Sequence, residues 1–167
     1  SNDASGSVVC ACLEGNRPIL VEVQALVAKT PYGMPRRTAV GFDYNRVTML
    51  LAILERRLGM DFGAYDAYVN VVGGMRVTEP AADLAVAAAL VSSYRNRPIP
   101  HGVLVMGEVG LTGEVRRIGS PERRIKDAMN LGFKRFVLPM GKLSLDEPCN
   151  GIVQVKTLEE ALDKVFA

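Results

Sequence analysis

Two segments near the N-terminus have the composition of strands, and in the second of them apolar residues alternate with polar ones, as in a half-buried strand. Segments 7–13 and 17–29 are rich in Val, Ile and Leu, and Glu14-Gly15-Asn16 separates them. Apolar residues that recur at every second position share one face of a strand. Gly and Asn tolerate the positive φ that a tight hairpin turn requires. The pattern therefore predicts an N-terminal β-hairpin with one largely polar face.

Beyond residue 42, helical spacing of apolar residues alternates with short apolar runs. Asp43 and Gly59 are suited to cap a helix whose apolar stripe includes Val47 and Leu50. An alanine-rich segment that opens with Pro80 and ends near Tyr94 is apolar nearly all round and predicts a buried helix. We also expect strands at 67–72, 103–106, 136–138 and 152–155, a helix from Ser120 to about Gly132, and a final helix after Thr157.

This order of elements predicts one α/β domain with a mixed sheet, in which the hairpin is followed by alternating strands and helices. The domain is expected to cover residues 7–167. Residues 1–6 are small and polar and are interpreted as a tag or linker remnant.

Composition narrows the class of protein. The chain has 167 residues, of which 49% are hydrophobic and 23% charged, and this balance excludes wholesale disorder. The sequence has no run of 18 apolar residues that would predict a membrane span, and it does not open with a leader typical of secretion. We therefore expect a cytoplasmic protein. Cys10, Cys12 and Cys149 form no C-x-x-C pair and predict reduced thiols without a metal site.

The net charge is only +2, but the basic residues are unevenly distributed. Five basic residues and one acid lie between positions 116 and 126, and a Pro- and Gly-containing loop at 30–37 ends in two arginines. Such clusters suit an anionic partner, since arginine binds phosphate or carboxylate bidentately. The candidate contacts are Arg36, Arg37, Arg116, Arg117, Arg123, Arg124 and Lys126. A solvated helix face, or pairing of Arg124 with Glu79 or Asp83, is the alternative interpretation.

Two long motifs carry a resemblance to a known family. The run from Gly73 to Ala85 resembles the nucleophile helix of the Lon protease proteolytic domain, and the run from Gly107 to Gly119 resembles its next signature. The resemblance covers about residues 8–139 and implies a Lon protease-like fold. At the positions where that family has a catalytic serine and lysine, this chain has Ala81 and Arg124. Alanine has no nucleophile, and arginine stays protonated at neutral pH. We therefore expect an inactive pseudoprotease; an active peptidase with another nucleophile is the disfavoured alternative.

A narrower resemblance comes from the Glu79-Pro80-Ala81-Ala82-Asp83 run and from segments 13–27 and 36–46. These closely resemble the C-terminal Lon-like domain of the RadA (Sms) family of bacterial DNA repair and recombination proteins. The resemblance implies a hexameric ring that migrates DNA branches, with this domain as scaffold and DNA-contacting surface. Its partners would be single-stranded or branched DNA and other copies of the chain.

The same resemblance leads us to expect no enzyme activity and no cofactor in this domain. The chain has neither a four-cysteine zinc site nor a G-x-x-x-x-G-K-[ST] phosphate loop. ATP, magnesium and zinc are therefore expected only in N-terminal regions of a longer, DNA-dependent ATPase. The runner-up interpretation is a pure oligomerisation scaffold that does not touch DNA.

Overall fold

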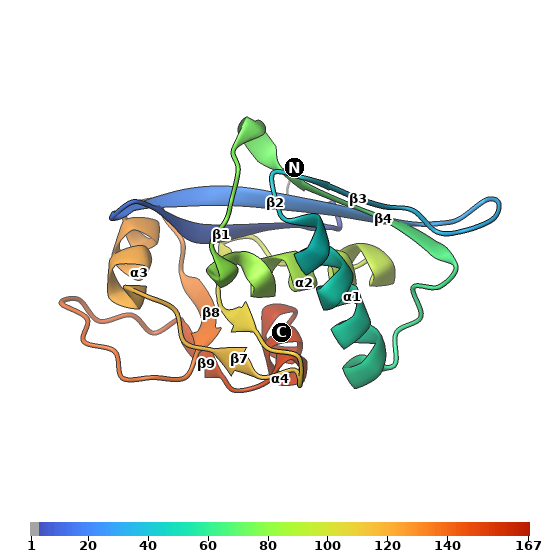
Figure 1. The fold of residues 1–167 in the computed structure, drawn as a ribbon. Coiled ribbons are helices and arrows are strands. Elements are labelled where there is room, and N and C mark those ends of the chain that lie inside the picture. The colour runs from blue at the N-terminus through green and yellow to red at the C-terminus, as the bar shows by residue number, and fades with distance from the viewer. Residues whose placement is uncertain (1–3) are drawn as a thin grey trace.

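A seven-stranded mixed sheet organises the molecule in the order β3-β4-β2-β1-β5-β8-β9. The computed structural model describes residues 4–167 (Figure 1). Strands β1, β2 and β4 pair antiparallel, whereas the pairs β3–β4, β1–β5, β5–β8 and β8–β9 are parallel. The strands are β1 Ser7–Glu14, β2 Arg17–Lys29, β3 Arg37–Val40, β4 Tyr65–Val71, β5 Val103–Val105, β8 Arg135–Pro139 and β9 Ile152–Val155. The expected α/β class and the N-terminal hairpin are confirmed.

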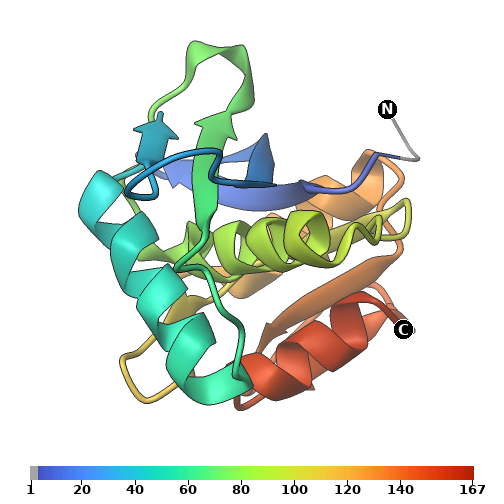
Figure 2. The same ribbon diagram turned by 90° about the vertical axis from the view of Figure 1, so that its right-hand side faces the viewer.

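Four helices and a small second hairpin complete the fold. The helices are α1 Tyr44–Leu58, α2 Asp83–Arg95, α3 Pro121–Asn130 and α4 Leu158–Val165, with short 3-10 turns η1 Val72–Gly74 and η2 Pro80–Ala82. Strands β6 Glu108–Val109 and β7 Val115–Arg116 form the separate hairpin. Figures 1 and 2 show α2 running beneath the N-terminal strands with α1 beside it. Because α2 is enclosed by these neighbours, nearly all its residues are buried, as its apolar composition predicted.

Helix α1 shows how local sequence determines an element's ends. The Asp43 carboxylate accepts a hydrogen bond from the backbone N–H of Asn45, and Gly59 takes the left-handed conformation at φ 67°. These two caps satisfy backbone groups that the helix itself leaves unpaired. Val47, Leu50 and the rest of the predicted stripe are buried against the core.

Three details differ from the sequence-based expectations. The segment expected to be a loop ends at Arg36, since Arg37–Val40 forms edge strand β3 alongside β4. Ser120 lies at the start of α3 as predicted, but it is left-handed at φ 53° and its side chain does not cap the helix. The helix expected from Pro80 begins with the 3-10 turn η2 instead.

The boundary of the folded domain also lies earlier than expected. Residues 1–3 of the segment interpreted as a remnant lie outside the described residues. Gly6, however, donates its N–H to the Ser92 hydroxyl at 2.8 Å and accepts from the N–H of Ala25 at 2.7 Å. Gly6 is therefore part of the fold. Within the described chain, no helix combines the length and apolarity needed to cross a membrane.

Candidate functional site

Ala81 occupies a buried position in η2, directly before α2. Its side chain is 4% exposed, and its carbonyl accepts a hydrogen bond from the N–H of Gly107 at 2.8 Å. This bond joins the first of the two sequence motifs to the second. Ala81 thus anchors the start of α2 through its backbone and offers no side-chain functional group.

Arg124 lies inside the protein and pairs with Glu79. The Arg124 side chain is 1% exposed, and its Nη2 donates to Glu79 Oε2 at 3.0 Å. The same guanidinium donates to the carbonyls of Ala11 and Gly119, each at 2.9 Å. Glu79 also accepts from the N–H of Leu13 at 2.8 Å. The structure therefore corrects the placement of Arg124 among the DNA-contacting residues: its donors are occupied, and the ion pair with Glu79 is the alternative that holds.

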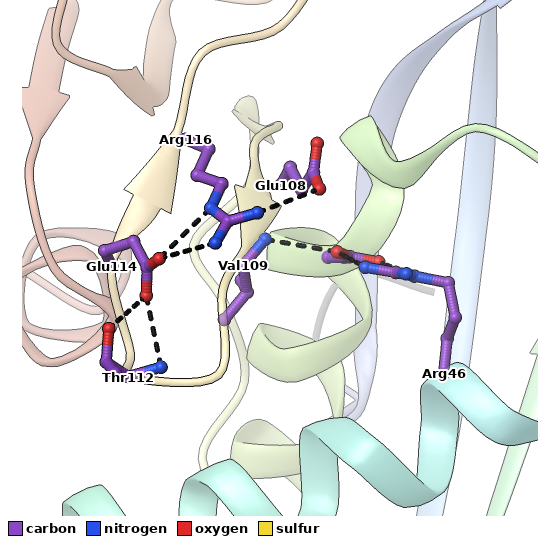
Figure 3. Close-up of polar contacts among 7 residues, drawn as sticks. Arg46, Glu108, Val109, Thr112, Glu114 and Arg116 are labelled. Carbon is purple, nitrogen blue, oxygen red and sulfur yellow. Dashed lines mark hydrogen bonds and ion pairs between the residues drawn. The ribbon is translucent and has the colours of Figure 1, made fainter.

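Asp83 has a different partner, which the sequence did not reveal. Its carboxylate is fully buried and forms a two-point ion pair with Arg46 of α1, whose Nε lies 2.7 Å from Asp83 Oδ1. It also accepts from the N–H of Val109 at 3.1 Å (Figure 3). Burial raises the pKa of Asp83, and the bonds from Arg46 and Val109 oppose that rise. The only sequence signal for this pair was an aspartate in an otherwise apolar helix, because a buried carboxylate needs a partner.

Arg116 is exposed but engaged within its own hairpin. Its guanidinium donates to Glu114 Oε2 at 2.8 and 3.1 Å and lies 3.8 Å from Glu108 (Figure 3). Glu114 accepts in addition from the hydroxyl and N–H of Thr112 at 2.5 and 3.1 Å. Hydrogen bonds from Thr112, its own backbone and Arg116 lower the pKa of Glu114 to about 2. Arg116 therefore stabilises the β6–β7 turn and is less available to an external anion than its exposure suggests.

Arg117 and Lys142 line a hollow of about 280 Å³ beside α3. Apolar side chains, including Ile118 and Leu143, form part of its wall. In the part of the chain that the structure describes, neither cation makes an ion pair. One acid, Glu122, lines the hollow, and its carboxylate accepts from the N–H of Ser144 at 3.2 Å. Sequence reasoning missed Lys142, because it lies outside the basic run and reaches this position only through the fold.

Arg123 and Lys126 lie on the adjoining face of α3. Both line a second hollow, of about 290 Å³, together with Asp146 and Glu147. Arg123 donates to the carbonyl of Asn16 at 2.7 Å and so ties α3 to the turn between β1 and β2. The two cations are exposed, but the neighbouring acids weaken the positive field around them.

Arg36 and Arg37 lie at the other end of the molecule. Figure 1 shows the β2–β3 loop and α3 at opposite ends of β2, a strand of 13 residues and so roughly 40 Å long. Arg37 donates to the backbone carbonyl of Phe62 at 3.0 Å and to that of Tyr65, whereas the Arg36 side chain is exposed. The predicted basic residues therefore divide into two regions and do not form a continuous surface.

The cysteines are free, as expected. Cys10 and Cys12 are buried on one face of β1, with their sulfur atoms 3.9 Å apart, and Cys149 is half-buried. The hydrogen bond with Cys12 and burial raise the pKa of the Cys10 thiol. A thiol held protonated in this way is a poor nucleophile and a poor metal ligand.

Comparison with known proteins relates the chain to RadA. It is 51% identical over 162 residues to the DNA repair protein RadA of Pseudomonas aeruginosa, which covers 96% of this chain and 36% of that protein. It is 47% identical to RadA of Halalkalibacterium halodurans and 46% identical to RadA of Bacillus subtilis, over 98% and 97% of the chain and 36% of each relative. The chain is therefore RadA-related and spans about a third of the length of these curated relatives.

A family model described as subunit ChlI of Mg-chelatase matches residues 23–142. This match contradicts two expectations, that the chain is no enzyme and that it takes no cofactor. The family is named after a subunit of Mg-chelatase, which is an enzyme, so the match overturns both expected absences. The residues Ala81 and Arg124 argue against peptidase chemistry alone. They could not support the broader conclusion that the chain is no enzyme and takes no cofactor.

The residues present do not show where nucleotide or magnesium would bind. Gly73-Gly74 is followed by no lysine and serine of a phosphate loop, and residues 4–167 contain no cluster of three His, Cys, Asp or Glu side chains placed to hold a metal ion. The described residues therefore fit neither a phosphate-loop nucleotide site nor a three-ligand metal site. The family model matches well over half of the length of this chain. The chain therefore belongs to the family of Mg-chelatase subunit ChlI.

Proposed function

We propose that this chain is the part of a RadA-type DNA repair protein that contacts the DNA backbone and helps to assemble the protein into a ring. The observation that carries the proposal is the identity of about one residue in two with proteins named DNA repair protein RadA, over nearly the whole chain. The two long motifs support a Lon protease-type fold for this part. Branch migration and a cytoplasmic location belong to the same proposal.

DNA contact is assigned to the cations that the fold leaves available. Arg117 and Lys142 converge on one hollow, and Arg36 is exposed at the far end of β2. Arg124 and Arg37 donate to internal acceptors instead. Guanidinium and ammonium groups bind phosphate without reading base sequence. We therefore expect weak, salt-sensitive binding of single-stranded or branched DNA with little sequence preference.

Assembly into a ring belongs to the proposal because each copy offers only a small number of these cations. A single copy offers few phosphate contacts and binds weakly at physiological salt. Six copies in a ring raise the avidity without any new type of contact. The hexamer is therefore the form in which the proposed DNA contact becomes effective.

A scaffold without DNA contact is the second candidate, and one observation favours it. Leu26 of β2 and Tyr68 of β4 are cross-strand neighbours, and with Val40 of β3 they are 56%, 38% and 55% exposed. They lie on the sheet face opposite the buried residues Val23 and Ala25. Exposed apolar side chains in one area are typical of a surface that another subunit covers.

A charge-reversal experiment separates the two candidates. The double variant Arg117→Glu and Lys142→Glu is compared with wild type for affinity to labelled DNA, by fluorescence anisotropy, and for molar mass, by light scattering. We expect at least a tenfold loss of DNA affinity with unchanged mass. Arg56→Glu with Lys164→Glu, two exposed sites with the same change in net charge, is the matched control. Loss of the assembly with unchanged DNA affinity per subunit would support the scaffold instead.

A further inference from the structure

The most exposed large apolar side chains of the described chain lie together at the tip of one loop. In the loop between β2 and β3, Tyr32 is 91% exposed and Met34 is 86% exposed. Gly33 between them adopts φ +69°, and an added Cβ there would meet nothing within 4 Å. Figure 1 shows this loop extending past the end of the sheet, away from the helices. Two such side chains have no role in the core.

The base of the loop is held firmly, although its tip is open. The Asp66 carboxylate accepts from the hydroxyl of Thr30 at 3.0 Å and from the N–H of Arg36 at 2.7 Å, so it joins the two ends of the loop. The N–H of Thr30 also donates to the carbonyl of Ala64 at 2.8 Å. Pro31 and Pro35 restrict the backbone on either side of the tip. Because the ends are fixed in advance, a ligand at the tip pays less entropy to order the loop.

The charged residues of the loop segment itself are all basic, and Asp66 lies at the base of the loop rather than at its tip. Lys29 and Arg36 flank the loop with exposed side chains, and no acidic residue occurs between Lys29 and Val40. An aromatic ring and a polarisable thioether beside two cations suit a ligand with flat faces and negative charge. Unpaired nucleobases on a phosphate backbone have both properties, since every base offers a π-face for stacking. A purely apolar protein groove would not use the cations.

We propose that residues 30–36 form a stacking finger for unpaired nucleobases, with Tyr32 as the stacking ring and Met34 beside it. Lys29 and Arg36 contact the adjoining phosphates. This inference rests on the proposed DNA contact and specifies which form of DNA the loop end of the molecule binds. The finger and the Arg117–Lys142 hollow lie near opposite ends of β2, roughly 40 Å apart, so a strand of about a dozen nucleotides at duplex spacing would span both.

The test compares two labelled 20-mers of equal charge, oligothymidylate and an abasic deoxyribose-phosphate strand, by fluorescence anisotropy at low salt. Wild type is expected to bind the base-bearing strand about tenfold more tightly, as stacking of a single base allows. The double variant Tyr32→Ala and Met34→Ala should lose this preference and keep its affinity for the abasic strand. Tyr32→Phe should retain the preference, because the ring is kept. Tyr44→Ala, at an exposed tyrosine of α1, is the matched control.

The outcomes distinguish this inference from the proposed function. Equal, salt-sensitive binding of both strands by wild type would overturn the stacking finger and leave the proposed phosphate contact standing. Absence of binding to either strand would overturn both. A finger variant that keeps the base preference but changes the molar mass in light scattering would assign the loop to a protein partner and overturn the inference. All substitutions are at exposed positions, and circular dichroism verifies that each variant is folded.

Discussion

At the scale of single residues, the pair formed by Arg124 and Glu79 links three parts of the chain. Arg124 belongs to α3, Glu79 precedes α2, and both also bond to the backbone of β1 through Ala11 and Leu13. A buried arginine is tolerated only when its charge and its donors are satisfied. Removing either partner leaves an uncompensated charge or unpaired donors in the interior.

The first prediction concerns that pair. Glu79→Gln should lower the free energy of unfolding by about 3 kcal/mol, since a buried charge loses its partner. Replacing both residues, as Glu79→Leu with Arg124→Met, should cost less than Glu79→Gln, because no charge remains buried. Urea denaturation at neutral pH measures both. Glu159→Gln, at an exposed glutamate in the first turn of α4, serves as the control and should change stability by less than about 0.5 kcal/mol. A Glu79→Gln variant as stable as that control would show that the ion pair is not a structural requirement.

At the scale of elements, the β6–β7 turn depends on an ionised carboxylate. Glu114 accepts hydrogen bonds from Thr112 and Arg116, and these hold its pKa at about 2 in the folded protein against 4.5 for an ordinary glutamate. Because folding lowers this pKa, the contribution of Glu114 to stability is complete above pH 4.5. It is lost as the pH falls from 4.5 towards 2.

The second prediction follows from this shift. In an NMR titration the carboxyl carbon of Glu114 should show a midpoint near pH 2, and Thr112→Val should move that midpoint upward towards 4.5. The Thr112 hydroxyl makes the largest contribution to the shift, so its removal has the clearest effect. A wild-type midpoint close to 4.5 would contradict the turn geometry of Figure 3.

Elements with a long, regular pattern were predictable from the sequence, and so were the short apolar strands β5, β8 and β9, whereas the edge strand β3 was not. The period of two in the hairpin and the capped stripe of α1 gave the right ends to within about a residue. Strand β3 has only four residues at the sheet edge, too few for a period to emerge. Its pairing with β4 depends on residues thirty positions away.

The candidate site was predictable only in part, because sequence position does not determine which cations are free. The basic run around α3 was evident, yet one of its members, Arg124, turns inward to Glu79. Another, Arg116, is held by Glu114, and Lys142 joins the surface from a distant loop. The loop at residues 30–36 could be predicted from its prolines and arginines, but only the structure showed that Tyr32 is exposed.

At the scale of the whole molecule, the cations that we propose contact DNA lie in two regions separated by the length of β2. One is the hollow of Arg117 and Lys142 beside α3, and the other is the loop that carries Arg36. A ligand that uses both must be long and negatively charged, which describes a nucleic acid strand better than a small anion. The similarity to proteins named DNA repair protein RadA supports the proposal that this ligand is DNA.

The most direct measurement is fluorescence anisotropy of a labelled single strand titrated with this chain at a series of salt concentrations. Each phosphate neutralised on a single strand contributes about −0.7 to the slope of log affinity against log salt, so four or five contacts predict a slope near −3. Such a slope, reduced by about 1 to 2 in a variant with Arg117→Ala and Lys142→Ala, is the result that the account predicts. No binding at low salt, or a slope near zero, would contradict it.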